Sequence, residues 1–418
     1  MKNTIDRAIE TLYHEGRDRL LSEKRLTALH NVFSQQFGRE PWYFISVPGR
    51  TELGGNHTDH NHGKVLAAAV DLDTIAWANQ VPGNKVTLIS EGFPEPFEVN
   101  LAQLTVVEGE KGTTTALIRG IAARLADLNY GIGGFEACMT SDISIGSGLS
   151  SSASVEVLIG TTFNALFNDG SIALEELAGI CQYAENHYFG KPCGLMDQMA
   201  CSVGGLIGID FKSNADPEIT RVHLDLDSEG YRLLIVETGG SHAGLTAEYA
   251  AIRSEMQAVA YALGEDNLRE LSSNDVLENL ARLRSEVGDR AILRAEHFFK
   301  ENERVDRQIE ALRHNDFQSF LRIINESGDS SYRWLQNIYT TRDPRHQSVA
   351  LALLLSEQFI ERNGTGAVRV HGGGFAGTIQ LFLPVELCDE YRKWMHEFIG
   401  PESIKVLQTR AIGSWYCQ

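Results

Sequence analysis

The segment SIGSGLSSSAS, at residues 144–154, is the most informative part of this chain. Two glycines allow a ligand to approach the backbone closely, and a run of three serines follows them. Apolar residues then recur at helical spacing from Val155 to Leu166, which predicts an amphipathic helix over residues 151–167. A glycine turn at the start of a helix presents free N–H groups and the positive end of the helix dipole, so this segment suits a phosphate group.

The same segment also has a simpler interpretation. A start of a helix that is rich in glycine and serine is often only a turn with an N-cap. It is not a Walker loop, because no lysine follows the glycines as the pattern G-x-x-x-x-G-K-[ST] requires. The phosphate-binding interpretation therefore depends on motifs elsewhere in the chain.

Four further segments supply that support. PGRTELGGNHTDHNHG lies upstream at residues 48–63, PCGLMDQ at 192–198, ETG at 237–239 continues to Tyr249 and Arg253, and VHGGGFAG lies at 370–377. In order, spacing and content, the set resembles the superfamily named after galactokinase, homoserine kinase, mevalonate kinase and phosphomevalonate kinase (GHMP kinases). Within it, residues 48–63 resemble the galactokinase signature, G-R-V-N-L-I-G-E-H-T-D-Y-N-x-G. The similarity extends from about residue 48 to residue 383.

The resemblance implies a two-domain α+β fold. An N-terminal domain of the ribosomal-protein-S5 type would span residues 1–215, and a ferredoxin-like domain of helices and sheet would span residues 216–418. The active site would lie in the cleft between them. The residues themselves favour a boundary near 211–221, where SNADP interrupts the pattern, and a length of 418 residues suits two domains.

Periodicity predicts the individual elements. Strand-like or apolar runs lie at 42–47, 65–70, 86–89, 135–140, 205–210, 233–236, 368–370, 378–383 and 404–407. Helical patterns lie at 113–128, 151–167, 174–189 and 391–398, before residue 37, and from 244 to 362 with breaks near 272–275 and 327–331. The first strand is expected to stop at Pro48 and Gly49.

Composition narrows the class of protein. A net charge of −19 argues against a nucleic-acid partner, and no segment has the length that a membrane span requires. The N-terminus lacks the apolar core of a signal peptide, so we expect a cytoplasmic protein. The six cysteines form no C-x-x-C pair and are expected to be reduced thiols. The oligomeric state is not predicted.

Phosphoryl transfer requires a positioned nucleotide, neutralised charge and an oriented acceptor hydroxyl. The resemblance implies ATP and Mg²⁺, with the nucleotide cradled by Gly146, Ser147, Gly148, Leu149, Ser150, Ser151 and Ser152. It also implies that Glu185 and Ser152 hold the magnesium ion, which prefers hard oxygen ligands. Without the resemblance, Glu185 would be one helical glutamate among many.

Asp197 lies among apolar residues in GLMDQM, and a carboxylate in such surroundings must be paired or perturbed. The resemblance makes it catalytic, accepting or orienting the proton of the sugar hydroxyl. Arg50 would keep this carboxylate ionised and help to neutralise the transferring phosphoryl group. The alternative is a turn or N-cap aspartate.

The segment at residues 56–62 carries three histidines and one aspartate, which invites a metal interpretation. The H-x-x-H-x-H spacing suits neither a single helix face nor a zinc loop, and an ordinary polar loop is the other alternative. The resemblance instead implies sugar binding by Asn56, His57, Asp59, Gly194 and Tyr249, with Asp59 accepting from two adjacent hydroxyls.

The chain departs from the galactokinase signature at several positions. Asn56 replaces a glutamate, His60 a tyrosine, Thr51 and Glu52 a Val-Asn pair, and Ala376 a glycine. An amide at residue 56 adds donors and removes a charge, so the exocyclic hydroxyl of galactose could be bound more weakly.

The expected activity is ATP-dependent phosphorylation of the anomeric (C1) hydroxyl of galactose. Two alternatives stay open: a kinase for a related sugar such as N-acetylgalactosamine or arabinose, and a non-catalytic sensor of galactose and ATP. The intact serine run, Asp197 and Arg50 favour the enzyme.

Overall fold

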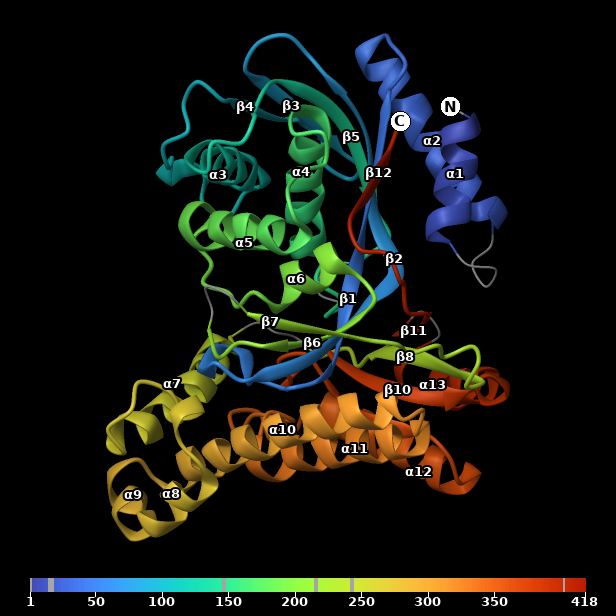
Figure 1. Ribbon diagram of the computed structural model, residues 1–418. Helices are drawn as coiled ribbons and strands as arrows, with labels where there is room; N and C mark the ends of the chain where they lie inside the picture. The colour runs from blue at the N-terminus through green and yellow to red at the C-terminus, as the bar shows by residue number, and fades with distance from the viewer. Residues whose placement is uncertain (1, 14–18, 145–147, 214–216, 241–243, 401–402) are drawn as a thin grey trace.

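The computed structural model describes the chain except residues 1, 14–18, 145–147, 214–216, 241–243 and 401–402 (Figure 1). Its strands are β1 (Tyr43–Gly54), β2 (Lys64–Gln80), β3 (Lys85–Ser90), β4 (Phe97–Asn100), β5 (Phe135–Ser141), β6 (Leu206–Asp210), β7 (Glu218–Val222), β8 (Tyr231–Glu237), β9 (Ala367–His371), β10 (Thr378–Pro384), β11 (Ile404–Leu407) and β12 (Trp415–Cys417). They form a larger sheet in the order β12-β1-β2-β5-β3-β4, which β6 and β7 join beside β2, and a smaller sheet in the order β11-β8-β10-β9.

The helices are α1 (Lys2–Leu12), α2 (Arg19–Phe37), α3 (Thr114–Asp127), α4 (Ser151–Phe167), α5 (Leu174–Ala184), α6 (Met196–Val203), α7 (Thr246–Ala262), α8 (Ser273–Glu278), α9 (Leu280–Glu286), α10 (Asp289–Arg313), α11 (Phe317–Ser330), α12 (Ser348–Asn363) and α13 (Cys388–Ile399). Short helical turns are η1 (Asp59–Asn61), η2 (Glu108–Glu110), η3 (Glu185–Phe189), η4 (Leu268–Glu270), η5 (Ser331–Leu335) and η6 (Val385–Leu387). None of these helices is long and apolar enough to cross a membrane.

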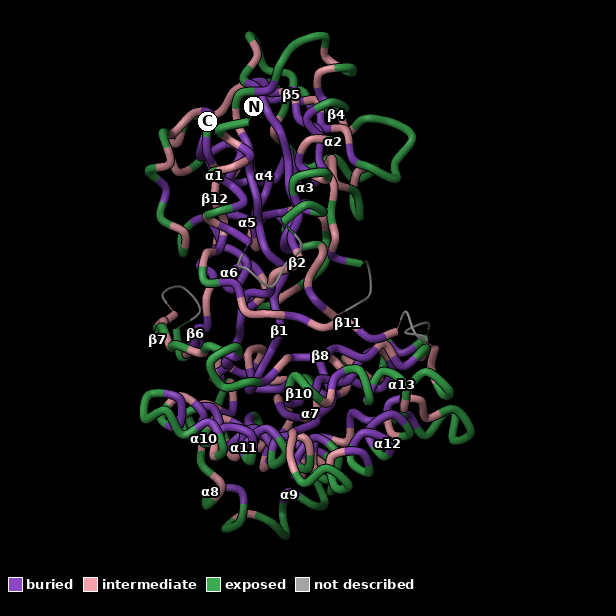
Figure 2. Tube along the Cα trace, turned by 90° about the vertical axis from the view of Figure 1, so that its right-hand side faces the viewer, coloured by how far each residue is buried: buried purple, intermediate pink, exposed green. Residues whose placement is uncertain are grey.

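Helices cover both faces of the larger sheet (Figure 1). Successive side chains of a strand point to opposite faces, so Phe44 packs with α1 and α2, whereas Ile45 and Val47 pack with α3, α4 and α5. At the other end of the molecule, α10 and α11 pack on one face of the smaller sheet and α12 and α13 on the other. Figure 2 shows the buried residues concentrated along these strands, with exposed residues on α8 and α9.

Strand β1 does not stop at Pro48 and Gly49, so that prediction was wrong. The pairing of β1 with β2 shifts register between Pro48 and Arg50, and the strand then continues to Gly54. A bulge accommodates a proline, which has no N–H to donate, without ending the strand. As a result Arg50, Thr51 and Glu52 are held on a buried strand.

Most predicted helices are confirmed, including α4 from Ser151 to Phe167 and the break at Ser272, which caps α8. The predicted helix at 174–189 is α5 followed by the π-helical turn η3, which begins at Glu185. The break expected at 327–331 is wrong, because α11 runs to Ser330 and continues as the π-helical turn η5.

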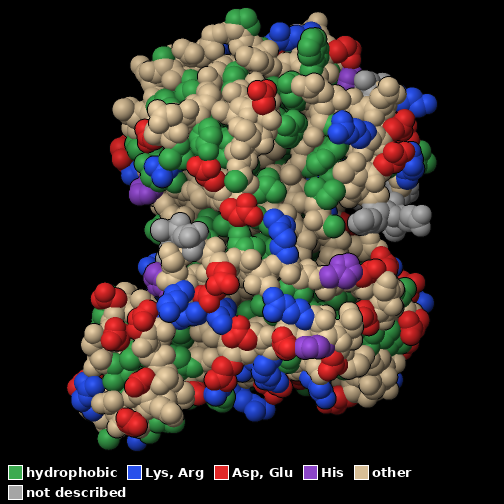
Figure 3. Space-filling model, viewed as in Figure 1, with side chains coloured by type: hydrophobic (Ala, Val, Ile, Leu, Met, Phe, Trp, Pro, Cys, Tyr) green, Lys and Arg blue, Asp and Glu red, His purple; other side chains and the backbone are tan. Residues whose placement is uncertain are grey.

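The predicted division into residues 1–215 and 216–418 stays a prediction. The chain passes from the larger to the smaller sheet between β7 and β8, and β12 returns to pair with β1. The core that joins the two sheets draws on β1, β2, β8, α10 and α11. On the face seen in Figure 3, acidic and basic side chains are intermixed over the helical half.

Candidate active site

The loop before α4 is joined to strand β1 by backbone and side-chain hydrogen bonds. The N–H of Arg50 donates to the carbonyl of Leu149 at 3.1 Å, and its Nη1 donates to the carbonyl of Gly148 at 2.6 Å. Ser150 is the N-cap residue and has a left-handed backbone with φ of 59°, which is uncommon for a residue other than glycine. Gly146 and Ser147 lie outside the described residues. The described loop therefore presents Ser150, Ser151 and Ser152 at the N-terminus of a helix.

Asp197, in the first turn of α6, meets this loop. Arg50 Nε donates to its Oδ1 at 2.7 Å, and Ser150 Oγ donates to its Oδ2 at 2.6 Å. Arg50 and Asp197 are 147 positions apart in the chain, so only the fold brings them together. Burial alone would raise the pKa of Asp197, but the Arg50 charge and these hydrogen bonds leave that pKa below its usual value. The carboxylate is thus ionised at neutral pH.

A cavity of about 620 Å³ opens beside this cluster. Its walls include Arg50 and the described residues Ser144, Gly148, Ser150, Ser151 and Ser152 of the loop before α4, here called the phosphate loop. They also include Ser90, Glu91, Gly92, Phe93, Thr114, Leu117, Met139, Thr140, Ser141, Ile143, Val155 and Phe189. These twelve residues come from β3 and the turn after it, α3, β5 and the segment after it, α4 and η3. Sequence reasoning did not identify them as site residues, because no local motif marks them. An apolar cavity next to a helix N-terminus suits a nucleotide, with the base in the cavity and the phosphates at the loop.

Glu185 is buried at the start of η3. Lys191 Nζ lies 2.8 Å from its Oε1, and Gln198 Nε2 donates to its Oε2 at 2.8 Å. The same Gln198 nitrogen donates to Glu156 Oε2 at 2.9 Å, while Glu156 Oε1 is buried without a hydrogen-bond partner. Burial and the neighbouring Glu185 charge raise the pKa of Glu156 well above its usual value. Sequence reasoning missed Glu156.

These carboxylates fit a hard cation. Glu156 follows Ser152 by four residues on α4, so the two share a helix face that points toward Glu185. Magnesium in phosphoryl-transfer sites takes one or two carboxylates and completes its shell with phosphate and water. The described residues contain no cluster of three or more metal-ligating His, Cys, Asp or Glu side chains. The oxygen donors therefore suit magnesium held jointly with a nucleotide.

The predicted sugar-binding residues collect on the other side of Asp197. A Cβ at Gly194 would lie 2.3 Å from Asp59 Oδ2, so only glycine allows this carboxylate to lie there. Burial and the charge of Asp197 raise the pKa of Asp59, which indicates that the two carboxyl groups are close. His57 binds the carbonyl of Gly373 at 3.0 Å through Nε2.

Tyr249, on α7, closes the same region. Its hydroxyl donates to the carbonyl of Gly374 at 2.9 Å, and its ring packs edge-on against Phe375. A Cβ at Gly373 would lie 2.7 Å from the Tyr249 ring. The triple-glycine turn between β9 and β10 therefore permits close contact with both α7 and the His57 segment.

The side chain of Asn56, for which the signature implies a sugar contact, is instead bonded to other groups of the protein. Its side chain is only 1% exposed, and its amide contacts Glu52, Gly372 and Asn337 inside the protein. The predicted contact of Asn56 with a sugar thus stays a prediction, and it would require one of these bonds to be replaced.

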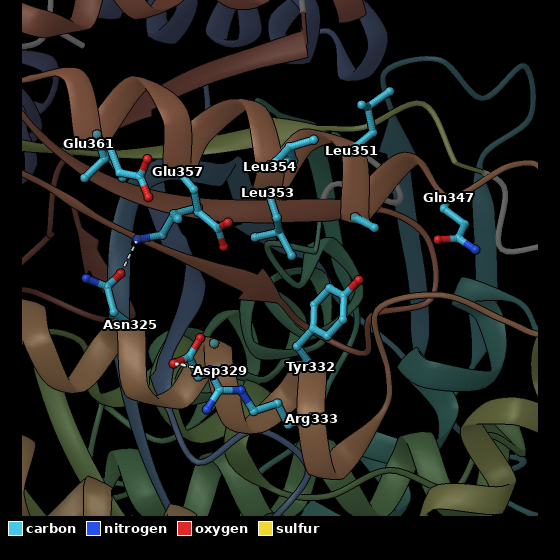
Figure 4. A pocket seen from close by; sticks show the side chains of 14 residues that line it. Asn325, Asp329, Tyr332, Arg333, Gln347, Leu351, Leu353, Leu354, Glu357 and Glu361 are labelled. Carbon is cyan, nitrogen blue, oxygen red and sulfur yellow. Dashed lines mark hydrogen bonds and ion pairs between the residues drawn. The ribbon is translucent and has the colours of Figure 1, made fainter.

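A second cavity, of about 740 Å³, lies between α11 and α12 (Figure 4). Asp329, Glu357 and Tyr332 point into it. Among the predicted site residues that the structure describes, none lines this cavity. The cavity beside α4, in contrast, is lined by Arg50, Gly148, Ser150, Ser151 and Ser152.

Comparison with known proteins is consistent with this arrangement. Two protein-family models match: the galactokinase galactose-binding signature at residues 31–80 and the GHMP kinases N terminal domain at residues 116–205. The galactokinase of Glaesserella parasuis is 31% identical over 370 residues, covering 87% of this chain and 91% of that protein. The Homo sapiens galactokinase is 31% identical over 410 residues, covering 94% of this chain and 96% of that protein.

Solved structures lead to the same family. The Lactococcus lactis galactokinase complexed with galactose superimposes with a TM-score of 0.77 at 26% identity, covering 94% of this chain and 99% of that one. The Methanococcus jannaschii mevalonate kinase, with a TM-score of 0.62 at 16% identity and coverage of 88% and 98%, shares the fold. The predicted GHMP kinase fold is confirmed, and the chain belongs to the galactokinase family.

Proposed function

We propose that this protein transfers the γ-phosphoryl group of ATP to the anomeric hydroxyl of galactose, yielding galactose 1-phosphate and ADP. One observation carries the proposal: Asp197 is held by Arg50 and by Ser150 of the loop before α4, and its charge acts on Asp59, which lies against Gly194. A phosphate donor and a sugar acceptor bound on either side would therefore meet at this carboxylate. The family membership supports the same activity.

In the reaction, the C1 oxygen of the sugar bonds to the γ-phosphorus while the bond from that phosphorus to the bridging oxygen of ADP breaks. Asp197 accepts the hydrogen bond of the C1 hydroxyl, orients it and takes its proton late in the transfer. Its lowered pKa makes it a weak base, but the loose transition state of phosphoryl transfer needs proton removal only late. Arg50 keeps Asp197 ionised and lies near the phosphate loop, where it offsets charge on the transferring group.

Ser152 and Glu185, with Glu156 beside them, would hold Mg²⁺ together with the nucleotide phosphates. Magnesium supplies charge neutralisation to the β- and γ-phosphates when it is bound. Gln198 keeps the Glu156 and Glu185 carboxylates next to each other through a single nitrogen. Lys191, whose side chain is 60% exposed, can turn out into solvent and free Glu185 Oε1 for the metal ion.

On the sugar side, Asp59 would accept hydrogen bonds from two adjacent hydroxyls, and His57, Gly194 and Tyr249 would line the pocket. The six cysteines are free thiols, which supports function in a reducing compartment such as the cytoplasm. Another sugar acceptor and a non-catalytic sensor are the alternatives.

The test is a screen of monosaccharides with ATP and Mg²⁺, read by coupled release of ADP. We expect turnover with galactose to exceed turnover with arabinose and N-acetylgalactosamine. A preference for arabinose or N-acetylgalactosamine would revise the assigned substrate, but the assignment as a kinase would stand. Absence of turnover with all sugars, accompanied by binding of galactose and ATP in calorimetry, would identify the sensor and refute the proposal.

A further inference from the structure

Two of the departures from the galactokinase signature are in contact with each other. The signature has Asn at the position of residue 52 and Glu at the position of residue 56, whereas this chain has Glu52 and Asn56. In the structure Asn56 Nδ2 donates to Glu52 Oε1 at 3.1 Å. Relative to the signature, glutamate and asparagine are therefore exchanged between positions 52 and 56, and a hydrogen bond joins the two side chains.

A buried arginine explains why such an exchange can be tolerated. Arg369, on β9, donates from Nη2 to Glu52 Oε1 at 2.5 Å, which is the same oxygen that Asn56 contacts. Its Nη1 is buried without a hydrogen-bond partner. A glutamate at position 56 would be one methylene longer than Asn56 and would come within reach of the same guanidinium. A carboxylate at either position pairs with Arg369, whereas two carboxylates would repel each other. With neither, Arg369 would rely on the Glu301 carboxylate, which already pairs with Arg304.

Asn56 also joins the two segments that carry the sugar-binding candidates. Its Nδ2 donates to the carbonyl of Gly372 at 2.8 Å, and its Oδ1 accepts from Asn337 Nδ2 at 2.9 Å and from Ser331 Oγ at 3.4 Å. With Glu52, these contacts use both donors and both acceptor positions of the amide. Asn56 thus has no hydrogen-bonding capacity left for a ligand.

The segment around Asn56 is held equally firmly through its backbone. His297 Nε2 binds the carbonyl of Asn56 at 2.9 Å, and Glu301 Oε1 accepts from the N–H groups of Gly55 and Asn56 at 3.1 and 3.3 Å. His57 follows directly and has a left-handed backbone with φ of 60°. The position of His57 therefore depends on the contacts that hold Asn56.

We infer that Glu52 and Asn56 form one coupled pair that positions the sugar-binding segment, and that Arg369 requires a single carboxylate at either of the two positions. The role in sugar binding rests on the proposed function. One consequence differs from what the signature alone suggests. The single change Asn56→Glu, which restores a signature residue, places a second carboxylate against Glu52 and impairs the protein. Only the double change Glu52→Asn/Asn56→Glu restores the pairing.

The test compares wild type with Glu52→Asn, with Asn56→Glu and with the double variant. In thermal unfolding without ligand, each single variant is expected to lose about 5 °C or more in Tm, and the double variant to recover at least half of that loss. The matched control is Glu52→Asn/Asn79→Glu, which restores the net charge at another buried asparagine and should recover nothing. A double variant that unfolds as early as the single variants would overturn the pairing.

The sugar readout is the KM for galactose measured beside the KM for ATP. Each single variant is expected to raise the galactose KM about tenfold or more, since losing a hydrogen bond to a charged group is of that order. The ATP KM should stay within about twofold, and the double variant should recover the galactose KM. An unchanged galactose KM in single variants that unfold earlier would overturn the positioning role. If wild type does not use galactose, the proposed function fails, while the Tm comparison still decides whether the pair is coupled.

Discussion

Asp197→Asn is the change that tests the active site most directly. Asparagine keeps the shape of the side chain and can still accept from Ser150, but it removes the charge that faces Arg50 at 2.7 Å. Losing a group that orients and deprotonates the acceptor costs roughly 10²–10⁴ in rate, or about 3–5 kcal/mol of transition-state stabilisation. The Arg50 side chain is 9% exposed and that of Asp197 is 34% exposed, so solvent offsets part of the lost ion pair. We expect a stability loss of about 1–2 kcal/mol.

The assay combines turnover with galactose, ATP binding by calorimetry and unfolding by denaturant. We expect turnover to fall at least about a hundredfold while ATP affinity changes less than about threefold, because the cavity walls do not include Asp197. The control is Asp210→Asn, which breaks a comparable contact of 2.6 Å to Arg269 outside the site. That variant should lose similar stability and keep its turnover. If Asp197→Asn kept more than about half of the wild-type turnover, the assignment of Asp197 would be refuted.

Three further changes test other parts of the site. Glu185→Gln should raise the Mg²⁺ concentration needed for half-maximal turnover about tenfold, because an amide neutralises less metal charge, and a titration that overlays wild type would exclude this ligand. Gly194→Ala should raise the galactose KM about tenfold or more and leave the ATP KM unchanged, because the added Cβ would lie 2.3 Å from Asp59 Oδ2. Equal changes in the two KM values would argue against a sugar contact at Gly194. His297 is buried and its pKa is lowered to about 4, below the unfolded value, so the unfolded state binds the proton first and stability should fall as pH drops from about 6.5 to 4. The free energy of unfolding should fall by about 3 kcal/mol for this group over that range. In His297→Gln, chemical unfolding at several pH values should show a smaller fall. An unchanged dependence of the free energy of unfolding on pH would assign the acid sensitivity to other groups.

The local elements of this protein could be predicted from the sequence because their causes are local. The apolar spacing after Ser151 predicts α4 with its exact bounds, and the residues flanking the triple glycine predict the pairing of β9 with β10. The galactokinase-like order of motifs also led to the correct family. Where a local rule competed with tertiary contacts, the prediction failed: pairing with β2 carries β1 past Pro48, although proline usually ends a strand.

The relationships between distant residues needed the tertiary structure. The sequence places Arg50 and Asp197 in separate motifs, and only the meeting of β1 with α6 makes them an ion pair. In the sequence, Glu156 is not distinguished from other helical residues. In the structure, Gln198 donates to both Glu156 and Glu185, which brings the two carboxylates together. In the sequence, Glu52 and Asn56 are two separate departures from a signature, and only the structure shows that their side chains are in contact. Periodicity and motif order reflect short-range preferences of the chain, whereas the protonation, pairing and orientation of buried polar groups depend on neighbours that only folding brings within a few ångströms.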